Sequence, residues 1–210
     1  MRLYHGSKKG LHGPIAPVSR DRCDFGRGFY MGTTPDQPLT LICNYPEARL
    51  YTLELDANSL RICTLKADLR WAMTVAYHRG KMDAARGTDL YAEAARSLAG
   101  ADIAIGPIAN DRMFIVLDRF FNGDITDRAL VESLSALQLG NQVVALSQQA
   151  CDSVSILETR TLADEERAEL IALSEANRAE GIALAERICR EYRREGRYFD
   201  EIVEAGAPLG

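Results

Sequence analysis

Alternating apolar and polar positions predict short β-strands along the first three quarters of the chain. The sequence RLYTLELD, at residues 49–56, alternates around Leu53 and Leu55 and predicts a half-buried strand. Short apolar segments bounded by glycine, proline and polar residues predict further strands. These lie at residues 1–4, 29–33, 102–106, 142–147 and 154–157.

Segments with helical spacing of apolar residues lie between these strands. Pro35 is predicted to open a helix that continues to Cys43, because proline is tolerated in a first helical turn. Thr126 is a candidate N-cap for a helix over residues 127–137. Strands mixed with inserted helices in this way predict an α+β fold. Further helices are predicted at residues 66–79, 89–98 and 112–121.

The last quarter of the chain has a different pattern. Residues 163–195 are rich in Ala, Glu, Arg and Leu, contain no proline, and repeat apolar positions every three or four residues. This pattern predicts one long amphipathic helix, eased at Gly181 and followed by a short second element at residues 198–204. We therefore expect a mixed domain over residues 1–158 and a helical extension over residues 159–210.

Composition narrows the classes of protein that fit. A hydrophobic fraction of 47% and a charged fraction of 26% are typical of a folded globular chain and argue against wholesale disorder. The formal net charge of −5 disfavours a broad electrostatic grip on nucleic acid, although a local basic patch stays open. The five cysteines include no C-x-x-C pair and are odd in number. We expect reduced core thiols and no metal.

Targeting signals are absent from the pattern. The N-terminal sequence MRLYHGSKKG lacks the apolar core of a signal peptide, and no apolar run is long enough for a membrane span. We therefore expect a cytoplasmic protein without a membrane partner.

The stretch DFGRGFYMGTT, residues 24–34, places Gly26 and Gly28 two positions apart, just before an aromatic pair. Glycine at this density lowers strand propensity, so the freed main chain is expected to have a use. A flat ligand would lie against it with the ring of Tyr30 stacked on the ligand, or the ring would simply pack in the core. Arg27 would reach a pyrophosphate or stay solvated.

A second stretch, LYHGSKK, puts His5 at the end of a predicted strand and directly before Gly6. The imidazole would hydrogen-bond a ribose hydroxyl, and the main chain of Gly6 would bind a carboxamide from both sides. Ser7 would donate its hydroxyl to the same carboxamide or close the turn. A lone histidine in such a place is also compatible with a structural role.

Taken together, LYHGS, DFGRGFYMGTT and NQVVALS resemble the three signature blocks of the ADP-ribosyltransferase superfamily, in the diphtheria-toxin and poly(ADP-ribose) polymerase-like branch. More narrowly, the chain resembles the DUF3990 family, which shares YHGS, DFG-x-GFY and a block present here as GPIANDR at residues 106–112. The resemblance covers roughly residues 1–157.

The resemblance implies a split pair of bent antiparallel β-sheets around a cleft that holds NAD as substrate. His5 would contact a ribose hydroxyl, the Gly6 main chain would hold the nicotinamide carboxamide, and Tyr30 would stack on the nicotinamide ring. Gln142 falls at the third signature position, where many active transferases carry glutamate. Ser7, Arg27 and Gly28 complete the expected NAD contacts.

Glutamine at this position has a chemical consequence. Cleavage of the nicotinamide–ribose bond builds positive charge on the ribose, so the loss of a carboxylate is expected to lower the rate by about 10²–10³-fold. The GPIANDR block offers another base, Asp111, with Asn110 and Arg112 as contacts to the acceptor. The alternative is that Asp111 caps the following helix.

Two functions of different class follow from these residues. The first is a mono-ADP-ribosyltransferase, as in a bacterial toxin or effector, that modifies an unknown macromolecular acceptor. Its C-terminal helix would seat a neutralising antitoxin or form a homodimer. The second is a catalytically weak module that binds NAD or ADP-ribose and signals through that helix. A related phosphate-removing enzyme that acts on RNA is disfavoured by the acidic balance.

Overall fold

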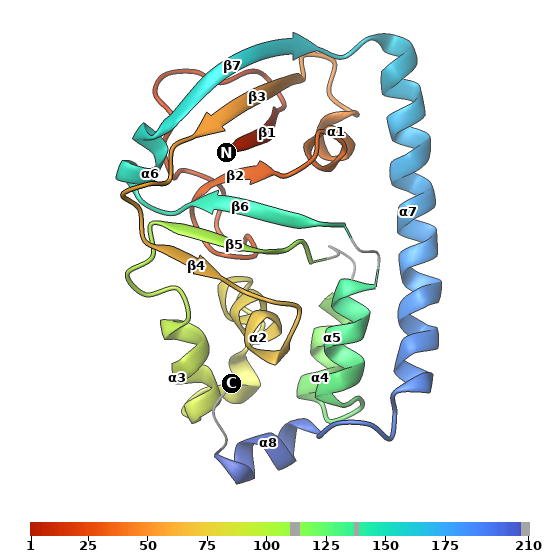
Figure 1. Cartoon of the computed structure of the whole chain (residues 1–210). Helices are drawn as coiled ribbons and strands as arrows, with labels where there is room; N and C mark the ends of the chain where they lie inside the picture. Colours follow the sequence, from red (N-terminus) through yellow and green to blue (C-terminus); the bar gives the residue numbers. More distant parts are fainter. Residues whose placement is uncertain (110–113, 137–138, 207–210) are drawn as a thin grey trace.

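Seven strands form one mixed sheet in the computed structural model, which describes residues 1–109, 114–136 and 139–206. Their order is β4-β5-β6-β2-β1-β3-β7, and every neighbouring pair is antiparallel except β4 and β5 (Figure 1). With the helices described next, this arrangement confirms the α+β class. The strands are β1 Arg2–Ser7, β2 Phe29–Gly32, β3 Arg49–Leu55, β4 Ile62–Thr64, β5 Ile103–Pro107, β6 Asn141–Ala145 and β7 Val154–Thr161.

The helices begin close to the predicted caps. Pro35 is the N-cap residue of α1, and the hydroxyl of Thr126 accepts a hydrogen bond from the backbone N–H of Ala129 at 3.2 Å at the start of α5. Three short elements of the described chain were not predicted from the sequence: β4, α6 and a 3-10 turn. The helices are α1 Asp36–Ile42, α2 Leu69–His78, α3 Asp89–Arg96, α4 Phe114–Phe121, α5 Asp127–Ser135, α6 Gln148–Asp152, α7 Asp164–Glu191 and α8 Phe199–Ala205, with a 3-10 turn at Asp83–Ala85.

The sheet is narrow at one junction. Strands β1 and β3 are in register over six residue pairs, from Arg2 with Glu54 to Ser7 with Arg49. Strands β1 and β2, in contrast, share the single pair Tyr4 with Gly32. The strands therefore form one sheet instead of the expected pair of sheets. Among neighbouring strands, β1 and β2 share the fewest residue pairs.

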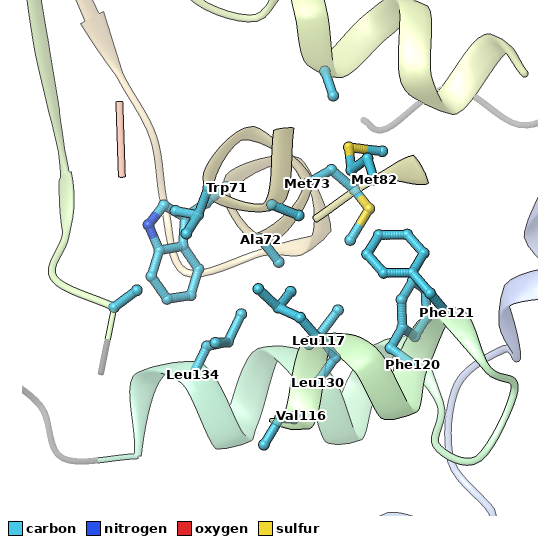
Figure 2. Packing of buried hydrophobic residues seen from close by; sticks show 14 of the residues in the cluster. Trp71, Ala72, Met73, Met82, Val116, Leu117, Phe120, Phe121, Leu130 and Leu134 are labelled. Carbon is cyan, nitrogen blue, oxygen red and sulfur yellow. The ribbon is translucent and has the colours of Figure 1, made fainter. Parts of the chain in front are cut away.

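The larger hydrophobic cluster lies between the sheet and helices α2 to α5. Figure 2 shows Trp71 and Met73 of α2 facing Leu117 of α4 and Leu130 of α5, with Phe120 closing one end. These five side chains are at most 1% exposed, so each contributes close to its full transfer free energy, about 1.5–3 kcal/mol for an aliphatic side chain. This packing holds α2 in place, and Arg79 at the C-terminal end of α2 belongs to the site described below.

The opposite face of the central strands packs into a second cluster. Leu3, Phe29 and Met31 are buried there, and Leu11 and Ile15 from the segment after β1 pack over them. Strand β3 is buried on both faces along most of its length, since Leu50 is only 4% exposed and Thr52 only 7%. The prediction of a half-buried strand was therefore wrong in this respect, because α1 and α7 cover the second face.

Helix α7 runs without interruption from Asp164 to Glu191, including Gly181. Near its start Leu170 joins a third cluster with Leu39 and Ile42 of α1. Its second half packs beside α5, where Ile188 and Cys189 are buried (Figure 1). The helical extension therefore contacts both the α1 side and the α5 side of the preceding domain.

All five cysteines are free thiols, and Cys43, Cys151 and Cys189 are buried as predicted, whereas Cys23 and Cys63 are only half-buried. Across the described ranges, no helix is both long and apolar enough for a bilayer crossing.

Candidate functional site

The three sequence blocks on which the resemblance to the superfamily rests lie on three adjacent strands. YHGS belongs to β1, FYMG to β2 and NQVVA to β6. Gly32 is in register with Tyr4 on one side and with Gln142 on the other, so these three residues form a row across the sheet. Because side chains alternate along a strand, Tyr30 lies on the same face as Gln142. Segments far apart in the sequence are thus neighbours here.

His5 lies on the other face of the sheet. It follows Tyr4 directly, so its side chain points away from Gln142, and its ring stacks on Phe29 with centroids 4.3 Å apart. The Nδ1 atom lies 2.7 Å from the carbonyl oxygen of Tyr30. The expected convergence of the three side chains on one ligand is therefore not what this register produces: only Tyr30 and Gln142 share a face.

The hydrogen bond fixes the tautomer of His5. A carbonyl oxygen can only accept, so Nδ1 must carry the proton and Nε2 keeps its lone pair. Burial lowers the pKa of His5, and the hydrogen bond to Tyr30 opposes this shift only in part. His5 is therefore neutral at pH 7. It connects β1 to β2 beyond Tyr4, where their main-chain register ends.

Tyr30 fixes the glycine-rich loop through its hydroxyl. The O–H donates to the carbonyl of Gly26 at 2.7 Å and accepts from the N–H of Phe25 at 3.0 Å. Burial is the main cause of the raised pKa of this phenol. The ring packs against the larger hydrophobic cluster. Its stacking on a nicotinamide stays a prediction, but its polar end is already bound by the protein.

Both glycines of the loop have reasons within the fold. Gly26 has φ +78°, and a Cβ there would lie 2.8 Å from Nδ1 of His78. A Cβ on Gly28 would lie 2.4 Å from Cγ1 of Val144, because β2 approaches β6 closely. Backbone conformation at Gly26 and close packing at Gly28 therefore explain both glycines without a bound ligand.

Arg27 and Ser7 both have partners within the protein: Arg27 lies in a surface ion pair and Ser7 closes a turn. The guanidinium of Arg27 pairs with Asp21 at 2.6 Å, and both side chains are well exposed. The hydroxyl of Ser7 donates to the carbonyl of Gly10 at 2.8 Å and closes the turn after β1. Contacts of either residue with NAD stay predictions.

Gly6 lies beneath α1. It is in register with Leu50 of β3 and has no register partner in β2. A Cβ at Gly6 would lie 2.9 Å from Cγ2 of Ile42 and 3.0 Å from the carbonyl oxygen of Pro38. Helix α1 therefore occupies the space that faces the Gly6 main chain.

Gln142 is buried and belongs to a polar network. Its Nε2 donates to Oδ2 of Asp24 at 2.7 Å and to the carbonyl of Pro107 at 3.2 Å. Asp24 in turn forms an ion pair with Arg79 at the end of α2, with side-chain exposures of only 6% and 9%. Both N–H groups of the amide are engaged, and within the described part of the chain no group donates to Oε1, so Oε1 is the atom of Gln142 that could accept a hydrogen bond from a ligand.

Sequence reasoning missed the roles of Asp24 and Arg79. The only sequence signal was the place of Asp24 in the DFG block, since its burial, which is rare for an aspartate without a partner, became visible only in the structure. The position of Arg79 depends on the packing of α2, which no local pattern reveals. The network places a carboxylate one hydrogen bond away from Gln142, with its charge balanced by the guanidinium.

Three predicted residues, Asn110, Asp111 and Arg112, lie outside the described residues. The N–H of Ala109, just before them, donates to Oδ2 of Asp24 at 3.4 Å. The segment that leads to Asp111 therefore begins next to the network of Gln142.

A pocket of about 300 Å³ opens on the outer side of the glycine loop. Its wall includes Arg27 and His78, together with Leu98 and Leu146. Burial lowers the pKa of His78. Among the described residues, no three metal-ligating side chains of the His, Cys, Asp and Glu type gather into a group that could hold an ion.

Comparison with known proteins gives one match. A family model described as "Protein of unknown function (DUF3990)" matches residues 1–156. No curated protein and no solved structure matches the chain.

Proposed function

Since the chain belongs to the DUF3990 family, and since its sheet narrows to one residue pair between the YHGS and GFY strands, we propose that it is an NAD-dependent mono-ADP-ribosyltransferase. In this proposal the narrow junction is the counterpart of the split between two sheets in that superfamily. The observation that carries the proposal is the row of Tyr4, Gly32 and Gln142, which joins all three signature blocks beside Gly6.

The residues take different parts in this scheme. The Gly6 main chain holds the nicotinamide carboxamide, and Oε1 of Gln142 orients a ribose hydroxyl. The ring of Tyr30 lies on the same face as Gln142 and borders the nicotinamide. His5 is a positioning residue, because its bond to the Tyr30 carbonyl keeps β2 beside β1.

The proposed reaction exchanges nicotinamide for the acceptor at C1 of the ribose. The bond between nicotinamide and C1 of ribose breaks, and nicotinamide leaves as a neutral molecule with the bonding electron pair. The acceptor then forms a bond to C1 and gives its proton to a base, for which Asp111 is the candidate. An amide at position 142 stabilises the developing cation less than a carboxylate does. We therefore expect a rate about 10²–10³-fold lower than that of a transferase with glutamate at this position.

A second function is favoured by the hydrogen bonds of Gln142. Its amide is held by Asp24 and Pro107, so it can orient a ribose but brings no charge of its own. A module with such a site would bind NAD or ADP-ribose without cleaving it. Its partner would then be reached through α7.

A binding measurement comes first. NAD at about 100 times its dissociation constant should stabilise the full chain by about 2.7 kcal/mol, which a thermal-shift experiment detects. Both functions require this shift. Its absence over a wide range of NAD concentration contradicts both.

Nicotinamide release separates the two functions. We expect slow release by the wild-type chain and release about 10²-fold faster by the exchanged pair Asp24→Asn/Gln142→Glu, which keeps one carboxylate in the network. Gln142→Glu alone should gain less, because two carboxylates at 2.7 Å would share a proton. Arg86→Ala, in an exposed ion pair with Asp83 and outside every proposed NAD contact, is the control. Stabilisation by NAD without release from any variant favours the binding module.

A further inference from the structure

Helix α1 covers the main chain that the proposed nicotinamide site needs. A Cβ on Gly6 would lie 2.9 Å from Cγ2 of Ile42 and 3.0 Å from the carbonyl oxygen of Pro38, too close for a real side chain, so α1 packs directly on this face of β1. Tyr30 and Gln142 lie on this same face, so a nicotinamide that is held at Gly6 and bordered by Tyr30 needs the space that α1 fills and can enter only when α1 moves away from β1.

Helix α7 holds α1 in this position through one arginine. Nη1 of Arg167 donates to the carbonyl of Cys43 at 3.0 Å and to that of Tyr45, and Nη2 donates to the carbonyl of Pro46 at 3.2 Å. Cys43 is the C-cap residue of α1. A single guanidinium thus binds three carbonyls at the end of the helix, where main-chain acceptors have no helical partner.

Apolar contacts reinforce this hold. Leu162 and Leu170, on either side of the start of α7, share a buried cluster with Leu39, Ile42 and Cys43. The approach of the chain to α7 is fixed as well, since Arg160 of β7 forms a two-pronged ion pair with Glu166 at 2.7 Å. α7 itself lies beyond residue 156, where the family match ends.

We infer that α7 is an autoinhibitory strap that keeps α1 closed over Gly6, and that release of the Arg167 contacts opens the proposed NAD site. This inference rests on the proposed function for the identity of the ligand. The closed state follows from the packing alone. The strap is α7, which lies outside residues 1–156 of the family match, and in this inference it controls whether NAD can enter the site.

Cys43 provides a native reporter of opening. Its thiol is fully buried between α1 and α7, whereas the thiol of Cys151 is buried in α6. Alkylation followed by peptide mass spectrometry gives a labelling rate for each thiol. We expect Arg167→Ala to raise the rate at Cys43 by about tenfold or more, since each hydrogen bond from a charged donor is worth about that factor. Cys151 should label at its wild-type rate.

Matched variants keep this experiment decisive. Arg187→Ala changes an exposed arginine on the same helix and should leave the rate at Cys43 unchanged. Arg167→Lys keeps the charge but cannot bind three carbonyls at once, so its rate should fall in between. An unchanged rate at Cys43 in Arg167→Ala overturns the strap. An equal rise at Cys151 overturns it too, because the opening would then be global unfolding.

NAD affinity tests the link to the site. The apparent affinity of a site that is open only part of the time is reduced by the open fraction, so Arg167→Ala should bind NAD more tightly by the factor seen in Cys43 labelling. Faster labelling with unchanged NAD affinity overturns the gating. Faster labelling when neither chain binds NAD supports the closure by α7 and contradicts the proposed function instead.

Discussion

The two faces of the central strands solve different problems. On one face, Phe29 and Met31 lie in an apolar cluster, and the neutral imidazole of His5 stacks on Phe29. On the other face, Gln142 is tied to a buried ion pair between Asp24 and Arg79. Adjacent residues of the same strands thus contribute to a packed layer and to a charged network.

The buried ion pair on the second face is harder to explain by stability than the apolar packing on the first. Burying an ion pair costs several kcal/mol of desolvation for each ion, and an apolar replacement of equal volume is often as stable. The apolar face needs no explanation beyond packing. The Asp24–Arg79 pair does, and its hydrogen bond to Gln142 connects it to the proposed site.

The largest effect is expected from breaking the charged face. Asp24→Asn removes the negative charge that faces the buried guanidinium of Arg79 and should lower the free energy of unfolding by about 3–5 kcal/mol in urea denaturation. Asp21→Asn is the matched control, because its pair with Arg27 is exposed, and it should change stability by less than about 0.5 kcal/mol. Equal effects of the two variants would mean that burial of the Asp24 pair has no energetic weight.

A smaller effect is expected from Tyr30, which joins the charged face to the glycine loop. Tyr30→Phe keeps the ring but leaves the N–H of Phe25 and the carbonyl of Gly26 without their partner, which should cost about 1–3 kcal/mol. Tyr45→Phe, at a more exposed tyrosine, should stay within about 0.5 kcal/mol. A wild-type unfolding midpoint for Tyr30→Phe contradicts the anchoring role of the hydroxyl.

The apolar face should respond to pH, with no effect at neutral pH and a growing one below it. The pKa of His5 is lower in the folded protein than its ordinary value of 6.5, so the unfolded chain binds more protons below that pH. Stability should therefore be constant above about pH 7 and fall as the pH drops below 6.5. His78, whose pKa is also lowered, adds to the same trend.

Urea denaturation at a series of pH values checks this. His5→Gln should flatten part of the decline, while His12→Gln, at an exposed position, should leave it as in the wild type. A decline of wild-type steepness in His5→Gln would assign the whole effect to other groups.

Local signals predicted the elements well. The hydroxyl of Thr126 bonds an N–H three residues later, and the ring of Pro35 restricts its own φ, so both helix starts depend only on nearby residues and could be predicted directly. Strand β1 continues to Ser7, past the predicted end at Tyr4, because pairing with β3 outweighs the low strand propensity of Gly6. The three residues of β4 form a strand only through their pairing with β5.

The site was harder to predict because it depends on how strands are aligned. The sequence correctly predicted strands at β2 and β6 and a strand ending near His5 at β1, but no sequence pattern states which face each side chain takes. A register with Tyr4 opposite Gly32 puts His5 and Tyr30 on opposite faces, and a shift by one residue would have reversed this. Arg79 reaches Asp24 only because α2 is packed under the sheet.

Strand β7 has a consequence for association with other chains. Among the described strands it is the last in the sheet and pairs with β3 alone, and it leaves Ile156 and Leu157 about half exposed. An open strand edge with apolar side chains can recruit a further strand from another molecule. Here the pairing shifts between Thr52 and Leu53, and the charged residues Glu158 and Arg160 follow directly. Irregular pairing and charge together oppose intermolecular sheet growth at this rim.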